Sequence, residues 1–262
     1  MAGRVPAKWK KAELAFWLLT PSTVACEIAR GAGYGALVLD MEHGVFTQDS
    51  ADPLIAFAGA IGFTVYARVA AAARVPIQQA LDAGADGVIL PHLDDLAHAS
   101  EATGFAKYPP LGTRSIGGGR TWSYGGAPAD FADRDNRRTR CFAMIETAGA
   151  LAEVRKIARL PTVDGLFVGA FDLGMARGRG GYRGTAADHA DIATIAAAAH
   201  SADKPWGMNV YGEKDRRICR RHGIGLAAVG DDHTALVGGA TALLAEAKAD
   251  LIGADRPRAS RR

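Results

Sequence analysis

The chain has 262 residues, of which 48% are hydrophobic and 23% charged, and its net charge at pH 7 is +3. So small a net charge argues against a nucleic-acid partner, and no apolar run reaches the ~18 residues of a membrane span. Three cysteines without metal-ligand spacing, Cys26, Cys141 and Cys219, fit a reducing compartment. The apolar segment near the N-terminus is too short for a signal peptide, so we expect a cytoplasmic protein.

Apolar runs typical of strands alternate with helical patterns along the chain. The predicted strands are Leu14–Leu19, Ala36–Glu42, Thr64–Val69, Gly87–His92, Arg140–Glu146, Gly165–Phe171, Pro205–Val210 and Leu226–Gly230. The predicted helices are Thr23–Gly31, Pro76–Ala83, Leu96–Ala106, Ala148–Ala158, Ala186–Ala199, Lys214–His222 and Thr234–Leu251. Glycines close several of these helices, as left-handed C-caps do.

Eight strands alternating with helices predict a single (β/α)8 TIM barrel over residues 1–252, followed by a basic tail at 253–262 that we expect to be mobile. A doubly wound open sheet is the alternative, but it usually has fewer strands and a glycine-rich first turn, which this sequence lacks. The segment from Tyr108 to Thr139 shows no periodicity and is predicted as a long loop at the catalytic rim or at a subunit contact.

Four of the apolar runs end in charged side chains. Asp40, Glu42 and His43 end one of them, and Arg68, Glu146 and Asp172 end three others. The carboxyl ends of the strands in a parallel barrel meet at one rim, where such barrels carry their active sites. The sequence therefore predicts one polar site at that rim.

Glu146 and Asp172 follow consecutive strands, which lie about 5 Å apart when paired, so both carboxylates can reach one cation. Two carboxylates completed by water suit Mg²⁺, Mn²⁺ or Co²⁺ better than Zn²⁺. The alternative is that both acids cap the helices that follow. His43 has the side chain of a general base, although a core histidine is an equal alternative for that residue alone.

Arg68 at the end of a buried strand needs an anion. It is either the cation for an oxygen that becomes negative during reaction or the partner of a nearby carboxylate. Gly169 and Ala170 are small enough for a ligand to approach the backbone N–H groups, although a tight bend would also explain them. Asp82 is, from periodicity alone, a solvated acid on a helix.

Several short motifs, in this order and spacing, resemble the HpcH/HpaI family of metal-dependent class II pyruvate aldolases over about residues 10–252. They are Leu39-Asp40-Met41-Glu42-His43, Ala67-Arg68-Val69, Ala80-Leu81-Asp82-Ala83-Gly84, Tyr108-Pro109-Pro110-Leu111-Gly112-Thr113-Arg114, Ile145-Glu146-Thr147, Val168-Gly169-Ala170-Phe171-Asp172-Leu173 and Ala228-Val229-Gly230-Asp231-Asp232. The family forms (β/α)8 barrels, often hexamers of dimers that exchange their last helix. The resemblance therefore implies a homo-oligomer, with a hexamer as the expected state.

By resemblance, Glu146 and Asp172 would bind a divalent metal that a 2-oxo acid, pyruvate, chelates. The amides near Gly169, Ala170 and Asp172 would hold the pyruvate carboxylate, and Arg68 would stabilise the enolate oxygen. His43 would be the base, acting through a metal-bound water or on the aldol hydroxyl.

The resemblance also promotes Asp82, which would orient His43 across a subunit contact. It implies reversible cleavage of a 4-hydroxy-2-oxo acid to pyruvate and an aldehyde. Oxaloacetate decarboxylation, biosynthetic carbon–carbon bond formation and a catalytically silent binding barrel are the alternatives. Three residues depart from the family pattern and alter the pocket wall, namely Met144, Phe171 and Gly174.

Overall fold

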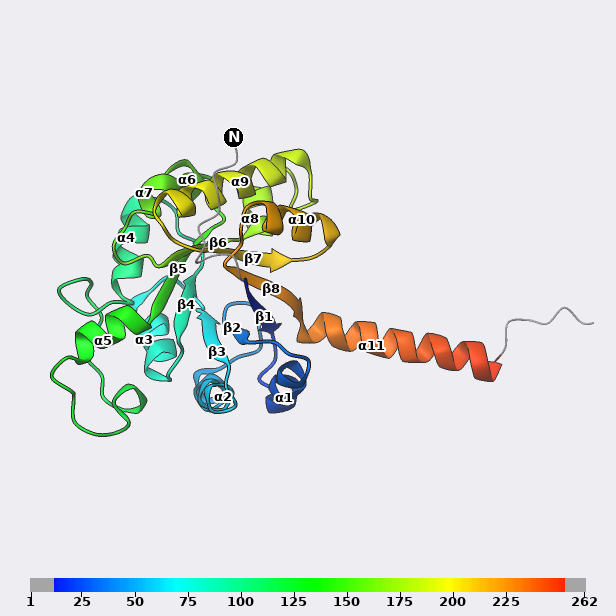
Figure 1. Cartoon of the computed structure of the whole chain (residues 1–262), viewed down its shortest axis with the longest axis horizontal. Helices are drawn as coiled ribbons and strands as arrows, with labels where there is room; N and C mark the ends of the chain where they lie inside the picture. Colours follow the sequence, from blue (N-terminus) through cyan, green and yellow to red (C-terminus); the bar gives the residue numbers. More distant parts are fainter. Residues whose placement is uncertain (1–11, 253–262) are drawn as a thin grey trace, which may run out of the picture.

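Residues 12–252 are described by a computed structural model, and in them eight parallel strands close into one barrel (Figure 1). The strands pair in chain order, and β8 returns to pair with β1. They are β1 (Glu13–Leu18), β2 (Ala36–Asp40), β3 (Thr64–Arg68), β4 (Gly87–Leu90), β5 (Arg140–Ile145), β6 (Gly165–Val168), β7 (Trp206–Val210) and β8 (Leu226–Asp231). The predicted (β/α)8 barrel is confirmed and the open sheet is wrong. The predicted tail, 253–262, lies outside the described residues.

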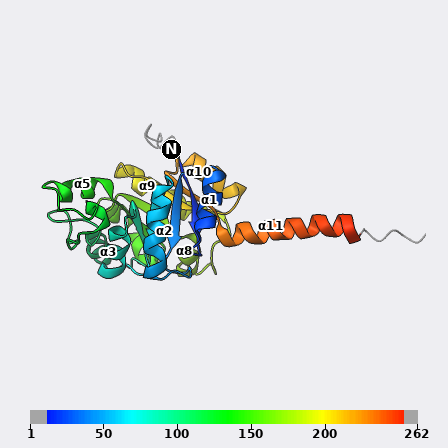
Figure 2. The same ribbon diagram turned by 90° about the horizontal axis from the view of Figure 1, so that it is seen from below.

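Helices connect the strands, and most of them lie around the barrel, whereas α11 extends away from it (Figure 2). They are α1 (Thr23–Gly31), α2 (Gln48–Ala60), α3 (Arg74–Asp82), α4 (Leu96–Gly104), α5 (Phe131–Arg138), α6 (Ala148–Ala152), α7 (Val154–Ile157), α8 (Ala170–Ala176), α9 (Ala186–Ser201), α10 (Glu213–Arg221) and α11 (Asp232–Ala247), with the short turns η2 (Arg120–Trp122) and η3 (Lys248–Ile252). Polar side chains cap many of them at the N-terminus; Ser22, Thr47, Asp95, Thr147 and Thr185 each accept a first-turn N–H. Among residues 12–252, no helix is long and apolar enough to cross a membrane.

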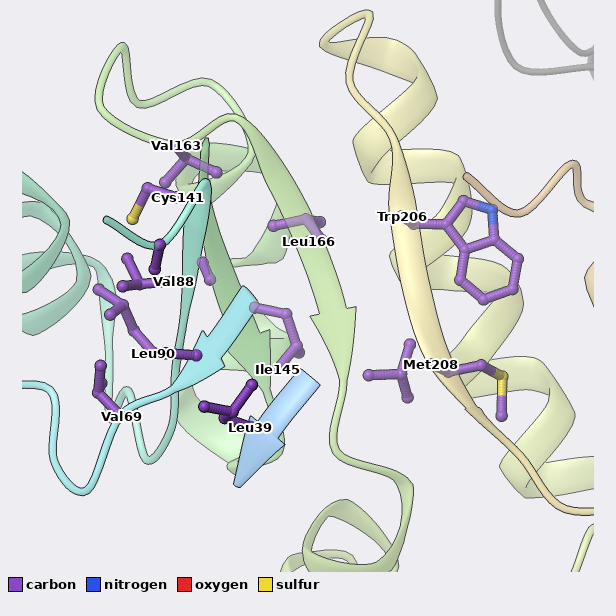
Figure 3. Close-up of a cluster of buried hydrophobic side chains, with 14 of the residues drawn as sticks. Leu39, Val69, Val88, Leu90, Cys141, Ile145, Val163, Leu166, Trp206 and Met208 are labelled. Carbon is purple, nitrogen blue, oxygen red and sulfur yellow. The ribbon is translucent and has the colours of Figure 1, made fainter. Parts of the chain in front are cut away.

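The alternation of side chains along each strand builds two apolar layers. One set points into the barrel and includes Ala15, Trp17, Val38, Tyr66, Ile89, Phe142, Met144 and Phe167. The other set points outward and packs under the helices, as Figure 3 shows for Leu39, Val88, Leu166 and Trp206. Because the period is two, Asp40, Arg68 and Glu146 fall on the inward face, above the last apolar layer.

Three sequence predictions need correction, and two helices, α2 and α8, were not predicted. The strand predicted at Gly165–Phe171 ends at Val168, and α8 starts two residues later, so Asp172 lies in the first turn of a helix. The predicted helix Ala148–Ala158 is broken at Glu153 into α6 and α7. The segment from Tyr108 to Thr139 is not all loop, because it contains η2 and α5. Helix α2 was missed, although a Thr47–Ser50 capping box begins it.

The last helix, α11, leaves the barrel instead of packing against it (Figure 1). Its large apolar side chains are exposed, including Leu236, Val237, Leu243 and Leu244. On the barrel wall, a groove of about 540 Å³ lies open between β1, β8 and α10, lined by Leu14, Val229, Ile224 and others. An uncovered apolar helix and an uncovered apolar groove thus occur in the same chain.

Candidate active site

A cavity of about 280 Å³ opens at the carboxyl ends of the strands. Its lining contains the predicted site residues His43, Arg68, Glu146, Gly169, Ala170 and Asp172, together with Trp17, Asp40, Phe171, Asn209, Tyr211 and Asp231. Six of the seven residues predicted from sequence therefore meet in one place. The cavity is slightly smaller than the ~300–1,000 Å³ typical of drug-sized ligands, which favours small substrates.

Arg68 lies between two acids and an aromatic ring. Asp40 and Arg68 are register partners on β2 and β3, and the guanidinium forms a two-pronged pair with Asp40, with Nε to Oδ1 at 3.0 Å. Nη1 of Arg68 lies 3.2 Å from Glu42, and the guanidinium carbon lies 5.1 Å from the centre of the Trp17 ring. The predicted alternative, a salt bridge to neighbouring carboxylates, is thus present in the structure.

The sequence analysis placed Asp40 at the polar rim and gave it no role of its own. Asp40 is 1% exposed, and it accepts hydrogen bonds from Trp17 Nε1 at 3.0 Å and from the backbone N–H of His43 at 3.0 Å. Burial alone would raise the pKa of this carboxyl, but the hydrogen bonds and charge of Arg68 outweigh it and hold the pKa below 3.8. Asp40 is therefore an anion that fixes both Arg68 and the turn carrying His43.

Glu146 points inward just after β5 and is 2% exposed. Its Oε1 accepts the backbone N–H of His92 at 2.5 Å and lies 3.6 Å from the His92 ring. Burial raises the pKa of this carboxyl; the His92 contacts lower it, and the negative charges of Glu42 and Asp172 raise it further.

The sequence analysis placed His92 at the end of a predicted strand and gave it no role. Its Nε2 lies 2.9 Å from Glu42, so the ring lies between Glu42 and Glu146. Its φ is +50°, in the left-handed region that non-glycine residues seldom adopt. The strained residue is thus the one whose backbone N–H contacts Glu146 and whose ring lies between Glu42 and Glu146.

The donor set fits a hard divalent cation. Glu146 and Asp172 interact unfavourably as anions, and a cation between them would relieve that repulsion. Gly169 makes the arrangement possible, since a Cβ there would lie 2.3 Å from Oε2 of Glu146. Among residues 12–252, no three His, Cys, Asp or Glu side chains are grouped to hold a metal.

His43 and Asp82 do not meet within one chain. The His43 side chain is 60% exposed, lines the cavity and lies 3.9 Å from Glu42. Asp82 ends α3, near the amino end of the next strand, and pairs with Arg114 at 2.7 Å. A contact between His43 and Asp82 therefore remains a prediction about two subunits.

A (β/α)8 barrel with acidic, basic and imidazole side chains at the carboxyl ends of its strands has the architecture of barrel enzymes. The chain belongs to the HpcH/HpaI aldolase/citrate lyase family, whose model matches residues 13–237. This confirms the resemblance drawn from the sequence motifs.

Three known proteins illustrate the relationship. The chain is 34% identical to a 2-dehydro-3,6-dideoxy-6-sulfogluconate aldolase of Pseudomonas putida, over 63% of the chain and 65% of that enzyme, which is just under two thirds of its length. It is 33% identical to a hydroxypyruvate/pyruvate aldolase of Paraburkholderia phytofirmans, over 81% and 85% of the two chains. A solved HpcH/HpaI aldolase/citrate lyase family protein from Burkholderia cenocepacia is 27% identical, with a TM-score of 0.83 over 91% and 95%.

Proposed function

We propose that this protein is a metal-dependent carbon–carbon lyase that cleaves a 4-hydroxy-2-oxo acid to pyruvate and an aldehyde, and also catalyses the reverse reaction. The observation that carries the proposal is that one small cavity is lined by an arginine, by two carboxylates that suit a divalent ion and by an exposed histidine. Aldolase relatives that align over most of this chain support the same reaction class.

Glu146 and Asp172 would hold the divalent ion, and Mg²⁺, Mn²⁺ or Co²⁺ suits two carboxylates. When bound, the ion supplies Lewis-acid polarisation of the 2-oxo group and so lowers the cost of forming an enolate. The two carboxylates are held differently, because Glu146 is buried against Gly169 and Asp172 lies exposed in the first turn of α8. Glu146 is thus the fixed ligand and Asp172 the adaptable one.

Arg68 would stabilise the oxygen that becomes negative. A guanidinium has five N–H donors, and the contacts to Asp40 and Glu42 use at most three, which leaves at least two for a substrate oxygen. The surrounding carboxylates hold the guanidinium in place before the substrate arrives, which is the preorganisation that electrostatic catalysis requires.

The start of α8 would receive the pyruvate carboxylate. No side chain caps this turn, and the N–H of Gly169 itself donates to the Ile145 carbonyl at 3.2 Å. The N–H groups of Ala170, Phe171 and Asp172 are therefore the ones we assign to the carboxylate, which refines the set expected from sequence.

In the cleavage direction, His43 takes the proton of the C4 hydroxyl. The C3–C4 bond breaks, C4 leaves as an aldehyde, and the electron pair of that bond passes into a C2–C3 enolate whose oxygen faces Arg68. A proton from solvent then adds to C3 and gives pyruvate, and His43 releases to solvent the proton that it took from the hydroxyl. The exposure of the His43 ring lets it exchange its proton with solvent between turnovers.

We further propose a homo-oligomer, with a hexamer as the specific expectation. The exposed apolar residues of α11 and the open groove beside β1 and β8 are complementary in character, and burying each against a second copy would remove both from water. The role of Asp82 beside His43 of another subunit, which the family resemblance implies, requires such an assembly.

The experiment follows deuterium entry into the pyruvate methyl group by NMR, together with aldehyde release from 4-hydroxy-2-oxo acids. We expect metal-dependent exchange, lost in Glu146→Ala and Asp172→Ala, and divalent-ion binding lost by calorimetry. Asp49→Ala is the matched control, because Asp49 is also an exposed acid in a first helical turn, that of α2. Pyruvate release from oxaloacetate without any aldol cleavage would instead favour a decarboxylase, and unchanged ion affinity in both site variants would exclude the metal site.

A further inference from the structure

Three aromatic rings stand together at the mouth of the cavity. Phe171 and Tyr211 have ring centres 5.3 Å apart at 85°, and Tyr182 lies 6.0 Å from each of them. We call Phe171, Tyr182 and Tyr211 the aromatic wall. Phe171 and Tyr211 line the same cavity as Arg68 and Glu146. The wall therefore borders the space in which the substrate would react.

The aromatic wall is held in place by one buried carboxylate. Asp215, near the start of α10, accepts the Tyr182 hydroxyl at 2.5 Å and the backbone N–H groups of Tyr211 at 2.9 Å and Gly212 at 3.1 Å. Asp215 thus joins the α8–α9 connection to the end of β7. Edge-to-face ring contacts add to this rigidity, so the wall is preorganised.

The wall is fixed and yet open to solvent. Phe171 is 51% exposed and Tyr211 is 56% exposed. A large apolar ring gains little from its burial when half of it remains in water. Fixed aromatic surface beside a polar cavity is typical of a ligand-binding surface. By the resemblance drawn from the sequence, Phe171 is also a position where this chain departs from the family pattern.

The charges near the wall are mostly negative. The Tyr211 hydroxyl is within the electrostatic influence of Asp215, Asp231 and Asp172, and of one cation, Arg68. Arg68 is already paired with two carboxylates. Two arginines that follow α8, Arg177 and Arg179, are paired with acids on α9. With a divalent ion held by Asp172, the acids left at this end of the cavity are Asp231, which lines it, and Asp215, and they disfavour a second anionic group.

We propose, building on the aldolase function above, that the aromatic wall selects the aldehyde, and that the preferred aldehyde is small, uncharged and aromatic. Its ring would stack against Phe171 and Tyr211 while its carbonyl carbon faces the enolate. The cavity of about 280 Å³ limits the aldehyde to about a single ring. Aldehydes that carry a carboxylate would be repelled by the acids around Tyr211.

The test measures kcat/KM for condensation of pyruvate with benzaldehyde, acetaldehyde and succinate semialdehyde. We expect benzaldehyde to be preferred. Each aromatic contact is worth ~0.5–1.5 kcal/mol, or roughly 2- to 13-fold, so Phe171→Leu and Tyr211→Leu should each lower the benzaldehyde-to-acetaldehyde ratio by that factor. Tyr124→Leu is the control, because Tyr124 is a 74% exposed ring outside the cavity lining, and it should keep the wild-type ratio.

Deuterium exchange into pyruvate separates the two proposals, because it needs no aldehyde. Absence of exchange in the wild-type enzyme would overturn the aldolase function. Normal wild-type exchange with no benzaldehyde preference, or with a ratio unchanged in both leucine variants, would overturn the role of the wall alone. The benzaldehyde-to-acetaldehyde ratio is measured within each variant, so a smaller amount of folded protein does not change it. If one leucine variant does not fold, the other one tests the role of the wall.

Discussion

Gly169→Ala should disable the site by displacing one carboxylate. Gly169 has a φ of −87°, which alanine adopts without strain, so any effect must come from the added carbon. That Cβ would lie 2.3 Å from Oε2 and 2.6 Å from Cβ of Glu146. The Oε2 atom of Glu146 could rotate away, but the Glu146 Cβ is bonded to the backbone just after β5 and cannot. Glu146 or the start of α8 must therefore move by about 1 Å to restore a normal contact between the two Cβ atoms.

The displacement sets the expected magnitudes. Overpacking a buried site costs ~1–3 kcal/mol, which for a chain of this size lowers the melting temperature by roughly 2–12 °C. A 1 Å misplacement of a reacting group costs about 10²-fold in rate. We therefore expect a folded protein with kcat/KM reduced about 100-fold and weaker divalent-ion binding, measured by calorimetry and by the aldol assay.

Gly212→Ala is the matched control. Gly212 is likewise the residue before a helix and has no side-chain cap, but a Cβ there meets nothing within 4 Å. The Gly212→Ala variant therefore measures the small loss of stability that alanine causes at an N-cap when its Cβ makes no clash. Wild-type kinetics and ion affinity in Gly169→Ala would refute the claim that Glu146 is a ligand fixed by its packing against residue 169.

Other substitutions examine the remaining groups. His43→Ala should slow aldol cleavage about 10²- to 10⁴-fold with little effect on pyruvate binding, whereas Arg68→Ala should also abolish deuterium exchange; exchange at the wild-type rate would leave Arg68 as a structural ion pair. Because the folded-state pKa of Asp40 is depressed, its stabilisation is present above about pH 4 and lost as pH falls through the folded pKa. Asp40→Asn should therefore have a lower free energy of unfolding than the wild type at pH 7, and should lose less of it on acidification, as measured by urea unfolding. Parallel curves of unfolding free energy against pH for the two proteins would contradict this. Light scattering should show an assembly larger than a dimer, and a monomer would rule out exchange of α11 and the cross-subunit role of Asp82.

The sequence alone determined the barrel and named most of the residues that we assign to the candidate site. Eight apolar runs separated by helical patterns leave few topologies, and a parallel barrel gathers the ends of its strands at one rim. Arg68 and Glu146 could be placed there because local periodicity decides which side of a strand they occupy, whereas His43 could be placed only by its position just after a strand. Asp82 could not be placed by periodicity, and the single chain still leaves its proposed partner on another subunit.

Tertiary structure decided the features that depend on contacts between distant segments. The left-handed His92, the packing of Glu146 against Gly169 and the aromatic wall join residues from different βα units, and no local pattern encodes such distances. Periodicity follows from the repeat of the backbone, whereas these contacts follow from how a closed barrel brings its strand ends together.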